Sequence, residues 1–380
     1  MHTPSTFDLA ICGAGPVGMA LAALLVQRGN RAARIALIDA KSIEQARRDP
    51  RTIALSHGSR QILEEAGAWP VEATPIHQIH VSRRGQFGRS LMDRSEHGVE
   101  ALGYVARYGA VVSALADVCE RLGVASLRPA LVTGSVEDGD GVSVQIDQAG
   151  AASSLRASLL VQAEGGLFGQ QPERTVSRDY GQSAIIAHVR TSAPIAHRAY
   201  ERFTDEGPLA LLPQDDGYAL VWCVPPTRAE QLLALDDAAF LARLGAAFGS
   251  RLGRFMHTTP RLAYPLGLNA QANGTARTVA IGNAAQTQHP VAGQGLNLGL
   301  RDAAVLARML AQDGSPAGLE RYASLRQTDR VLTVRVTDTM ARIFTGSAPT
   351  QGLLGLSLGL LDAFSPARKA LAGLMMYGRR

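Results

Sequence analysis

The sequence predicts an α/β protein in which a domain built on a parallel sheet is interleaved with an α+β domain built on a largely antiparallel sheet. Two glycine-rich turns, near residues 13 and 293, each follow a short apolar strand and lead into a helix. Between them, residues 177–268 change to alternating polar and apolar strands. Because 380 residues exceed one ordinary core, two closely packed domains are expected.

The turn near residue 13 lies in the context that dinucleotide binding requires. It follows the apolar strand Phe7–Cys12 and precedes a helix over Met19–Arg28. Asp39 comes directly after a second strand, Ile35–Ile38. In such a turn the first glycine makes the tight bend, the second lets a pyrophosphate approach, and the third allows close helix–strand packing. Asp39 is placed to bond a ribose hydroxyl. The turn itself comprises Gly13, Ala14, Gly15, Pro16, Val17 and Gly18.

The second turn follows the apolar run Thr278–Ile281 and leads into a helix from about Leu296. Gly293 and Gly295 expose backbone N–H groups at the start of that helix, where the helix dipole favours negative charge. Such a loop suits a flat ring that gains negative charge when it is reduced. The first turn alone does not distinguish NAD binding from FAD binding, whereas the second turn favours FAD binding.

This second segment resembles the second FAD signature of the group A aromatic hydroxylases, which share the p-hydroxybenzoate hydroxylase fold. The resemblance implies a Rossmann-like FAD-binding domain in which Gly282 and Asn283 meet the ribityl chain. Asn283 and Gln286 are the version carried by ubiquinone-biosynthesis hydroxylases, where other members have Asp and His. The resemblance also implies a loop that faces the isoalloxazine through its backbone, and this loop contains Pro290, Gly293, Gln294 and Gly295, followed by Leu296 and Asn297 as further FAD contacts.

Three further positions match the family less completely. Arg51 lies in a segment by which these hydroxylases place an arginine near the flavin and pyrophosphate, where its planar fork could bind phosphate; an ordinary surface arginine is the alternative. Arg107 stands where the family usually has Glu or Gln towards FAD. Glu164 replaces the Asp of an Ala-Asp-Gly turn that serves FAD and the transient visit of NAD(P)H, or else it is an exposed residue at a strand end.

The resemblance runs nearly end to end and is strongest to the 2-polyprenyl-6-methoxyphenol hydroxylases of ubiquinone biosynthesis. Glu201–Thr204, Gly207–Pro213 and Ala263–Leu266 carry it within the alternating strands. One face of their sheet is expected to pack on helices, and the other to form the floor of an apolar cavity. The expected division is residues 1–70, 101–176 and 269–345 for the FAD-binding domain, 71–100 and 177–268 for the substrate domain, and 346–380 for a C-terminal helical tail.

Composition narrows the class of protein. With 46% hydrophobic and 19% charged residues the chain is typical of globular proteins. The net charge of +5 weakly favours anionic partners, but the arginines are scattered rather than clustered, which argues against nucleic acid. The cysteines and histidines show no metal-ligand spacing. Three separated cysteines and the lack of a signal-like N-terminus predict a cytoplasmic protein with reduced thiols. The apolar run Gly352–Leu361, followed by basic residues, either completes the core or docks at the inner face of the membrane.

The resulting hypothesis is an FAD-dependent monooxygenase that hydroxylates a polyprenylated phenol, with NAD(P)H and O₂ as co-substrates. The resemblance implies that reduced FAD forms a C4a-hydroperoxide that the phenol ring attacks. Partners within a ubiquinone-biosynthesis complex are also implied. Two alternatives stay open: a related hydroxylase that acts at another ring position or on a non-prenylated aromatic, and a flavin-binding assembly subunit without turnover, as the Glu164 departure would allow. The choice between NADH and NADPH and the oligomeric state stay open.

Overall fold

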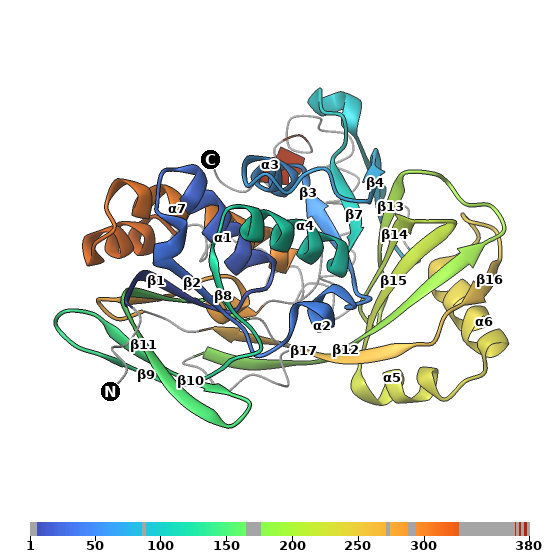
Figure 1. Ribbon diagram of the computed structural model, residues 1–380. Coiled ribbons are helices and arrows are strands. Elements are labelled where there is room, and N and C mark those ends of the chain that lie inside the picture. The colour runs from blue at the N-terminus through green and yellow to red at the C-terminus, as the bar shows by residue number, and fades with distance from the viewer. Residues whose placement is uncertain are drawn as a thin grey trace.

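The computed structural model describes residues 6–85, 89–164, 176–270, 274–287 and 294–326, and positions 369, 372, 373, 376 and 377 near the C-terminus. These residues form two large sheets and one small sheet, and helices cover the large sheets (Figure 1). Strands of the two large sheets alternate along the chain: residues 78–93, 176–270 and 286–287 contribute to one sheet, and residues 6–38, 125–162 and 278–280 contribute to the other. This arrangement confirms the predicted α/β fold class. The exact domain boundaries stay a prediction.

The first large sheet has seven strands in the order β8-β2-β1-β11-β10-β9, and β18 pairs with the end of β11. The strands β1, β2, β8, β11 and β18 run parallel, whereas β9 and β10 form an antiparallel extension. Their bounds are Thr6–Cys12 for β1, Ile35–Ile38 for β2, Ala125–Leu127 for β8, Leu131–Glu137 for β9, Val142–Gln148 for β10, Ala151–Gln162 for β11 and Thr278–Ala280 for β18.

Side chains alternate between the two faces of this sheet, and each face has its own cover. Leu9 and Ile11 of β1 pack among the helices, while Ala10 and Cys12 pack against apolar residues of β10. The helices over the first face are α1 (Pro16–Gln27), α3 (His57–Glu65), α4 (Tyr108–Arg121) and α7 (Gln294–Gln312). Both faces are therefore buried, as a parallel sheet requires. The short helices α2 (Ile43–Arg47), η1 (Ala32–Arg34) and η4 (Gly282–Ala284) lie in the connections.

The second large sheet has nine strands in the order β19-β17-β12-β15-β14-β13-β5-β6, and β16 also pairs with β12. All its pairings are antiparallel except that of β13 with β5. The bounds are Gln78–Arg83 for β5, Arg89–Asp93 for β6, Val176–Thr191 for β12, Arg198–Phe203 for β13, Pro208–Gln214 for β14, Gly217–Val224 for β15, Phe255–Thr258 for β16, Leu262–Ala270 for β17 and Gln286–Thr287 for β19. The short helix η2 covers Arg94–His97.

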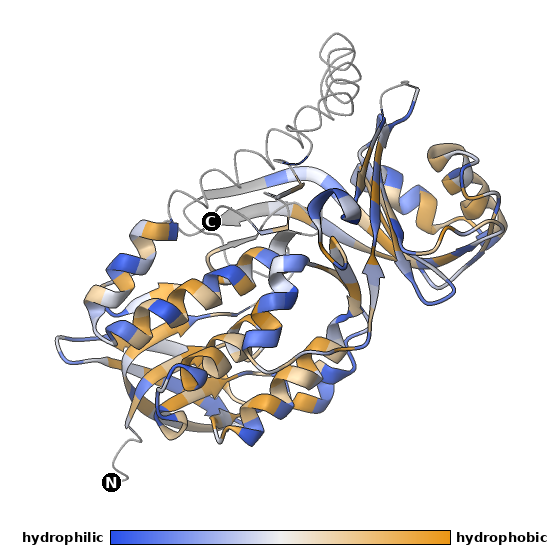
Figure 2. Cartoon of the chain, turned by 90° about the horizontal axis from the view of Figure 1, so that it is seen from above, coloured by the Kyte–Doolittle hydropathy of each residue, from blue (hydrophilic) through white to orange (hydrophobic). Residues whose placement is uncertain are grey.

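One face of this second sheet is covered by α5 (Pro226–Leu233) and α6 (Asp237–Phe248). Trp222 and Tyr218 of β15 and Phe240 of α6 are among its fully buried side chains. Figure 2 shows hydrophobic residues running along the strands of both sheets and along the helices that cover them. Burial of these apolar side chains away from water supplies the main stabilisation of the fold.

The small sheet joins the two large ones. It has the order β3-β7-β4, with β3 at Thr52–Ser56, β4 at Ala73–Ile76 and β7 at Gly103–Arg107. Its Val105 packs against Ala199 of the second sheet. The hydroxyl of Thr52 also donates a hydrogen bond to the side-chain oxygen of Gln214 at 2.9 Å. The face of the second sheet opposite to α5 and α6 is thus held against the dinucleotide-binding part.

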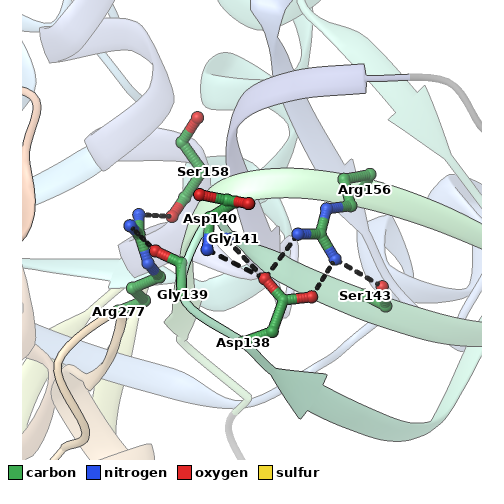
Figure 3. Close-up of polar contacts among 8 residues, drawn as sticks. All are labelled: Asp138, Gly139, Asp140, Gly141, Ser143, Arg156, Ser158 and Arg277. Atoms are coloured by element: carbon green, nitrogen blue, oxygen red, sulfur yellow. Dashed lines mark hydrogen bonds and ion pairs between the residues drawn. The ribbon is translucent and has the colours of Figure 1, made fainter.

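A polar network fixes the outer turn between β9 and β10 to the segment that leads into β18 (Figure 3). Asp138 accepts hydrogen bonds from Arg156 and from the backbone of Asp140 and Gly141. Arg277 donates to the backbone oxygens of Gly139 and Ser158. The hydrogen bond from Arg156 is the main reason that the pKa of Asp138 lies below its usual value. The network places the start of the second glycine-rich segment beside β11.

Several sequence expectations are confirmed, and others shift by a few residues. All three cysteines are free and buried. Helix α1 begins at Pro16 rather than Met19, because proline is well tolerated in the first turn of a helix. Strand β12 lies within the region 177–268 that was predicted to contain alternating strands, and it begins one residue earlier, at Val176. No helix in the described part of the chain is long and apolar enough to cross a membrane. Most of the tail 346–380 lies outside the described residues, but Ala372 and Met376 are buried against Met92 and Leu102.

Candidate functional site

The glycine-rich turn after β1 shows two different requirements for glycine. Gly13 has a φ of +103°, and a Cβ there would lie 2.5 Å from the backbone of Ala163 and Glu164. A Cβ on Gly18 would lie 2.0 Å from the backbone oxygen of Gly13. At Gly15, by contrast, the nearest atom is the Tyr108 hydroxyl, 3.2 Å away. The fold therefore requires the first and third glycines, while the second leaves open space at the start of α1.

This open space has the features of an anion site. Gly15 is the N-cap of α1, with no side-chain hydrogen bond to the helix start, and Pro16 follows it. Backbone N–H groups and the helix dipole at such an end favour a phosphate. The residues present therefore fit a pyrophosphate held by the turn Gly13–Gly18.

Asp39 lies directly against the same turn. Its Oδ2 accepts a hydrogen bond from the backbone N–H of Ala14 at 2.8 Å, and its Oδ1 accepts one from the N–H of Lys41 at 2.8 Å. Arg128, only 8% exposed, lies 3.8 Å from this carboxylate and donates to the backbone oxygens of Ala14 and Lys41. Arg128 was not anticipated from the sequence, because it follows β8 in a segment without a motif.

Arg51 lies close to the turn, but its fork has a different partner from the one expected. Its Nε and Nη2 bind the carboxylate of Asp49 at 2.9 and 2.7 Å, and its guanidinium stacks over the ring of Tyr108 at 4.5 Å. Burial alone would raise the pKa of Asp49, but the hydrogen bonds from Arg51 outweigh burial and lower it. Because the hydroxyl of Tyr108 faces Gly15, the pair Arg51–Asp49 borders the proposed phosphate position.

Arg107 and Glu164 also have defined places. Arg107 is exposed, and its Nη2 donates to Asp215 at 2.6 Å, in the hairpin turn between β14 and β15. Glu164 is exposed at the end of β11, next to Gly13. Burial, and secondarily the charge of Glu164, raise the pKa of the Cys12 thiol to about 12. Whether Arg107 and Glu164 contact FAD stays a prediction.

The second glycine-rich segment meets the first one. Gly282 has a φ of +58°, and a Cβ there would contact both γ carbons of Val17 at 3.4 Å. Gly299 of α7 also approaches Val17, since a Cβ on it would lie 2.7 Å from that side chain. The side-chain oxygen of Asn283 would be 3.7 Å from a Cβ on Gly295. The segment Gly282–Asn283 and the start of α7 are therefore assembled beside the turn Gly13–Gly18.

A buried ion pair supports this assembly. Asp302 is fully buried, and its Oδ2 accepts the N–H of Gly282 at 3.0 Å while its Oδ1 accepts from Nε of Arg326 at 2.7 Å. The carboxylate thus links the chain segment after β18, the middle of α7 and Arg326. Removing either side chain would break this ion pair inside the fold.

Asn297 serves the fold in a way that the sequence did not predict. Its side chain is buried, accepts a hydrogen bond from the N–H of Ser56 at 2.8 Å and donates to the backbone oxygen of Ala54 at 2.9 Å. It therefore attaches α7 to β3. Leu296 is partly buried against the main core. Of the other predicted positions, Pro290 and Gly293 lie outside the described residues, as does the side chain of Gln294.

An apolar cavity of about 70 Å³ adjoins this region. Asn297 and Ser56 are its polar lining residues, and Met376 reaches it from the C-terminal end of the chain. The remaining lining residues come mainly from the small sheet and from β5 and β6, and they are Ala54, Leu55, Ile76, Ile79, Met92, Leu102, Gly103 and Ala372. Among the described residues, no group of three or more His, Cys, Asp or Glu side chains could hold a metal ion.

The family model for the FAD binding domain matches residues 6–334. The chain belongs to this family. Ubiquinone hydroxylase UbiL of Rhodospirillum rubrum is 32% identical over 379 residues, which cover 95% of this chain and 87% of that protein. The 3-demethoxyubiquinol 3-hydroxylase of Escherichia coli is 28% identical over 377 residues, which cover 94% of each chain. These matches identify the chain as an FAD-dependent monooxygenase.

Solved structures agree with this membership at the level of the fold. The p-nitrophenol 4-monooxygenase PnpA from Pseudomonas putida superposes with a TM-score of 0.76 at 18% identity and covers 99% of this chain and 100% of its own. HpxO of Klebsiella pneumoniae, in complex with FAD, gives a TM-score of 0.73 at 16% identity, with 98% of each chain covered. A flavin-dependent halogenase, CmlS, shares the fold too, with a TM-score of 0.69 at 16% identity, 87% of this chain and 63% of its own being covered. The fold therefore supports FAD and leaves the substrate to be argued from the site.

Proposed function

We propose that this monooxygenase hydroxylates a polyprenylated phenol of the 2-polyprenyl-6-methoxyphenol type in ubiquinone biosynthesis. The observation that carries the proposal is the similarity along nearly the whole chain to UbiL and to the E. coli 3-demethoxyubiquinol 3-hydroxylase. The cavity beside the FAD-binding residues supports it through the apolar character of its lining, which suits an apolar part of the substrate.

In this proposal the bound FAD, reduced by NAD(P)H, supplies the redox chemistry that splits O₂ and delivers one oxygen atom to the ring. The start of α1 at Gly15 binds the pyrophosphate, and Asp39 binds the adenosine ribose. Asn283 and the backbone of Gly282 hold the ribityl chain, and the N–H groups of Gly293 and Gly295 stabilise negative charge on the flavin ring.

The two alternatives make different demands on the protein. A hydroxylase for another ring position or for a non-prenylated aromatic would use the same FAD residues with a different substrate contact. A flavin-binding assembly subunit would bind FAD but hydroxylate no substrate. The proposal also includes partners in a ubiquinone-biosynthesis complex and docking of the C-terminal tail at the inner membrane face. Neither of these changes the proposed chemistry.

The test is turnover by the purified protein. We expect a yellow protein with one FAD per chain, whose oxidation of NADH or NADPH rises when a short-chain prenylated phenol is added. Mass spectrometry under ¹⁸O₂ should find one labelled oxygen in the product. FAD binding with no phenol-dependent oxidation of either nucleotide would favour the assembly subunit and contradict the proposed enzyme.

A further inference from the structure

The large antiparallel sheet has two chemically different faces. Tyr200, Leu211 and Trp222 point towards α5 and α6 and are fully buried. The intervening residues of the same strands point the other way and form what we call the inner face. Ala199 of β13 belongs to the inner face and packs on Val105 of β7. The inner face therefore looks towards the FAD-binding part of the molecule (Figure 1).

Glu201 stands on the inner face, two residues beyond Ala199 on β13. The strand register places it in a row across the sheet with apolar neighbours: Val81 on β5, Ala210 on β14, Val221 on β15 and Ile186 on β12. All five side chains of this row are only half-buried in the described structure. A carboxyl group thus lies within an apolar surface that is incompletely covered.

The carboxylate of Glu201 has no hydrogen bond or ion pair with any other described residue. Burial raises its pKa to about 7. The neighbouring titratable group is the Cys223 thiol, whose pKa is raised by burial first and by the charge of Glu201 second. Because this carboxylate lies in an apolar surface and is not paired with a described residue, the position fits a ligand that donates a hydrogen bond.

The inner face also connects Glu201 to the two parts of the proposed site. On one side, Ile79 follows the same face of β5 as Val81 and lines the apolar cavity. On the other side, Cys223 pairs with Ala184, and Ala184 with Tyr264 of β17. Tyr264 lies near Arg51, which borders the phosphate position at Gly15. Glu201 therefore lies between the apolar cavity and the FAD-binding residues.

We propose that Glu201 accepts the proton of the substrate's phenolic hydroxyl during hydroxylation. Glu201 would then be a catalytic residue, a role that the sequence analysis did not assign to it. The inference rests on the proposed function. As the ring carbon ortho or para to the hydroxyl forms its bond to the incoming oxygen atom, the phenolic O–H bond breaks and its proton moves to the Glu201 carboxylate. The resulting dienone then loses the proton of that same carbon to water, and its carbonyl oxygen takes back the proton held by Glu201, so that the ring becomes aromatic again. NAD(P)H supplies the two electrons that reduce the second oxygen atom to water.

The experiment compares the Glu201→Gln holoenzyme with the wild type on two soluble probes, 2-prenylphenol and a ring-fluorinated 2-prenylphenol that is already ionised at the assay pH. Gln keeps the size and can still accept a hydrogen bond, but it cannot take the proton. We expect turnover of 2-prenylphenol to fall by roughly 100-fold or more, as for loss of a general base. The loss with the ionised phenol should be under about tenfold, because that proton has already left.

Glu230→Gln is the matched control. Glu230 is an exposed carboxylate on helix α5, which covers the opposite face of the same sheet. This substitution should leave both rates unchanged. FAD content and melting temperature are measured on every variant. Glu201→Gln should not lower the melting temperature above pH 7, because it removes a charge from an apolar surface. If Glu201→Gln does not retain FAD, Glu201→Leu replaces it, because Leu cannot accept a proton either, and the same dependence on the acidity of the phenol is predicted.

The outcomes separate this inference from the proposed function. A wild type that oxidises neither phenol contradicts the enzyme itself. An active wild type whose Glu201→Gln variant turns over 2-prenylphenol normally, or loses both activities by the same factor, overturns the role of Glu201 as proton acceptor and leaves the proposed function standing.

Discussion

Replacing Gly15 by Val should yield a folded protein that is colourless. The open space at Gly15 allows a side chain with only a small shift of the Tyr108 hydroxyl, so the fold survives. That side chain would occupy the pyrophosphate's place and remove hydrogen bonds to a charged group, each worth about 1.5–3 kcal/mol. FAD affinity should therefore fall by about 100-fold or more. Fluorescence titration of the apo-protein with FAD measures this directly.

Gly18→Ala is the matched comparison, and it should fail in the opposite way. Its Cβ would lie 2.0 Å from the backbone oxygen of Gly13, so strand β1 and helix α1 would have to separate. We expect a loss of roughly 3 kcal/mol or more in the free energy of unfolding of the apo-protein. If Gly15→Val unfolds the protein as well, or binds FAD with unchanged affinity, the assignment of the open space to the pyrophosphate is contradicted.

Replacing Asp302 by Ala should destabilise the protein strongly even without FAD. The substitution leaves the guanidinium of Arg326 buried without its carboxylate and removes the acceptor of the Gly282 N–H. Losing one partner of a buried ion pair typically costs about 3–5 kcal/mol. Urea denaturation of the apo-protein measures the loss. FAD affinity of the variant should fall too, because Gly282 is part of the second glycine-rich segment.

The control is Asp216→Asn, which removes one partner of an exposed ion pair with Arg190. Such a pair contributes less than about 1 kcal/mol. Equal effects of the two substitutions would show that Asp302 does not carry a buried charge interaction in solution.

The sequence was sufficient for features that depend on local backbone geometry. Gly13 and Gly18 are required by close approaches to Ala163 and to the backbone of the turn, and such approaches leave a recognisable glycine spacing. The alternation of polar and apolar residues in the region of β14 and β15 likewise predicted a sheet with one face packed on helices. The fold class followed from these signals and from the family resemblance.

Features that depend on long-range pairing were not predictable in the same way. Arg128 reaches Asp39 only because β8 pairs with β2, and nothing around Arg128 marks that partner. Asn297 lies within a recognisable FAD motif, yet its side chain is used to hold β3. The length of strand β12 was not predictable, because it depends on pairing with β15, β16 and β17 along different parts of the strand. Glu201 becomes significant only when the register surrounds it with apolar residues.

The most direct test of the central claim is mass spectrometry of the quinone extract from a strain that lacks this gene. The account predicts that a polyprenylated phenol with one ring oxygen fewer than its normal successor accumulates. It also predicts that the wild-type gene clears this compound and that the Gly15→Val gene does not. A normal level of ubiquinone with no accumulated prenylated precursor would contradict the proposed function.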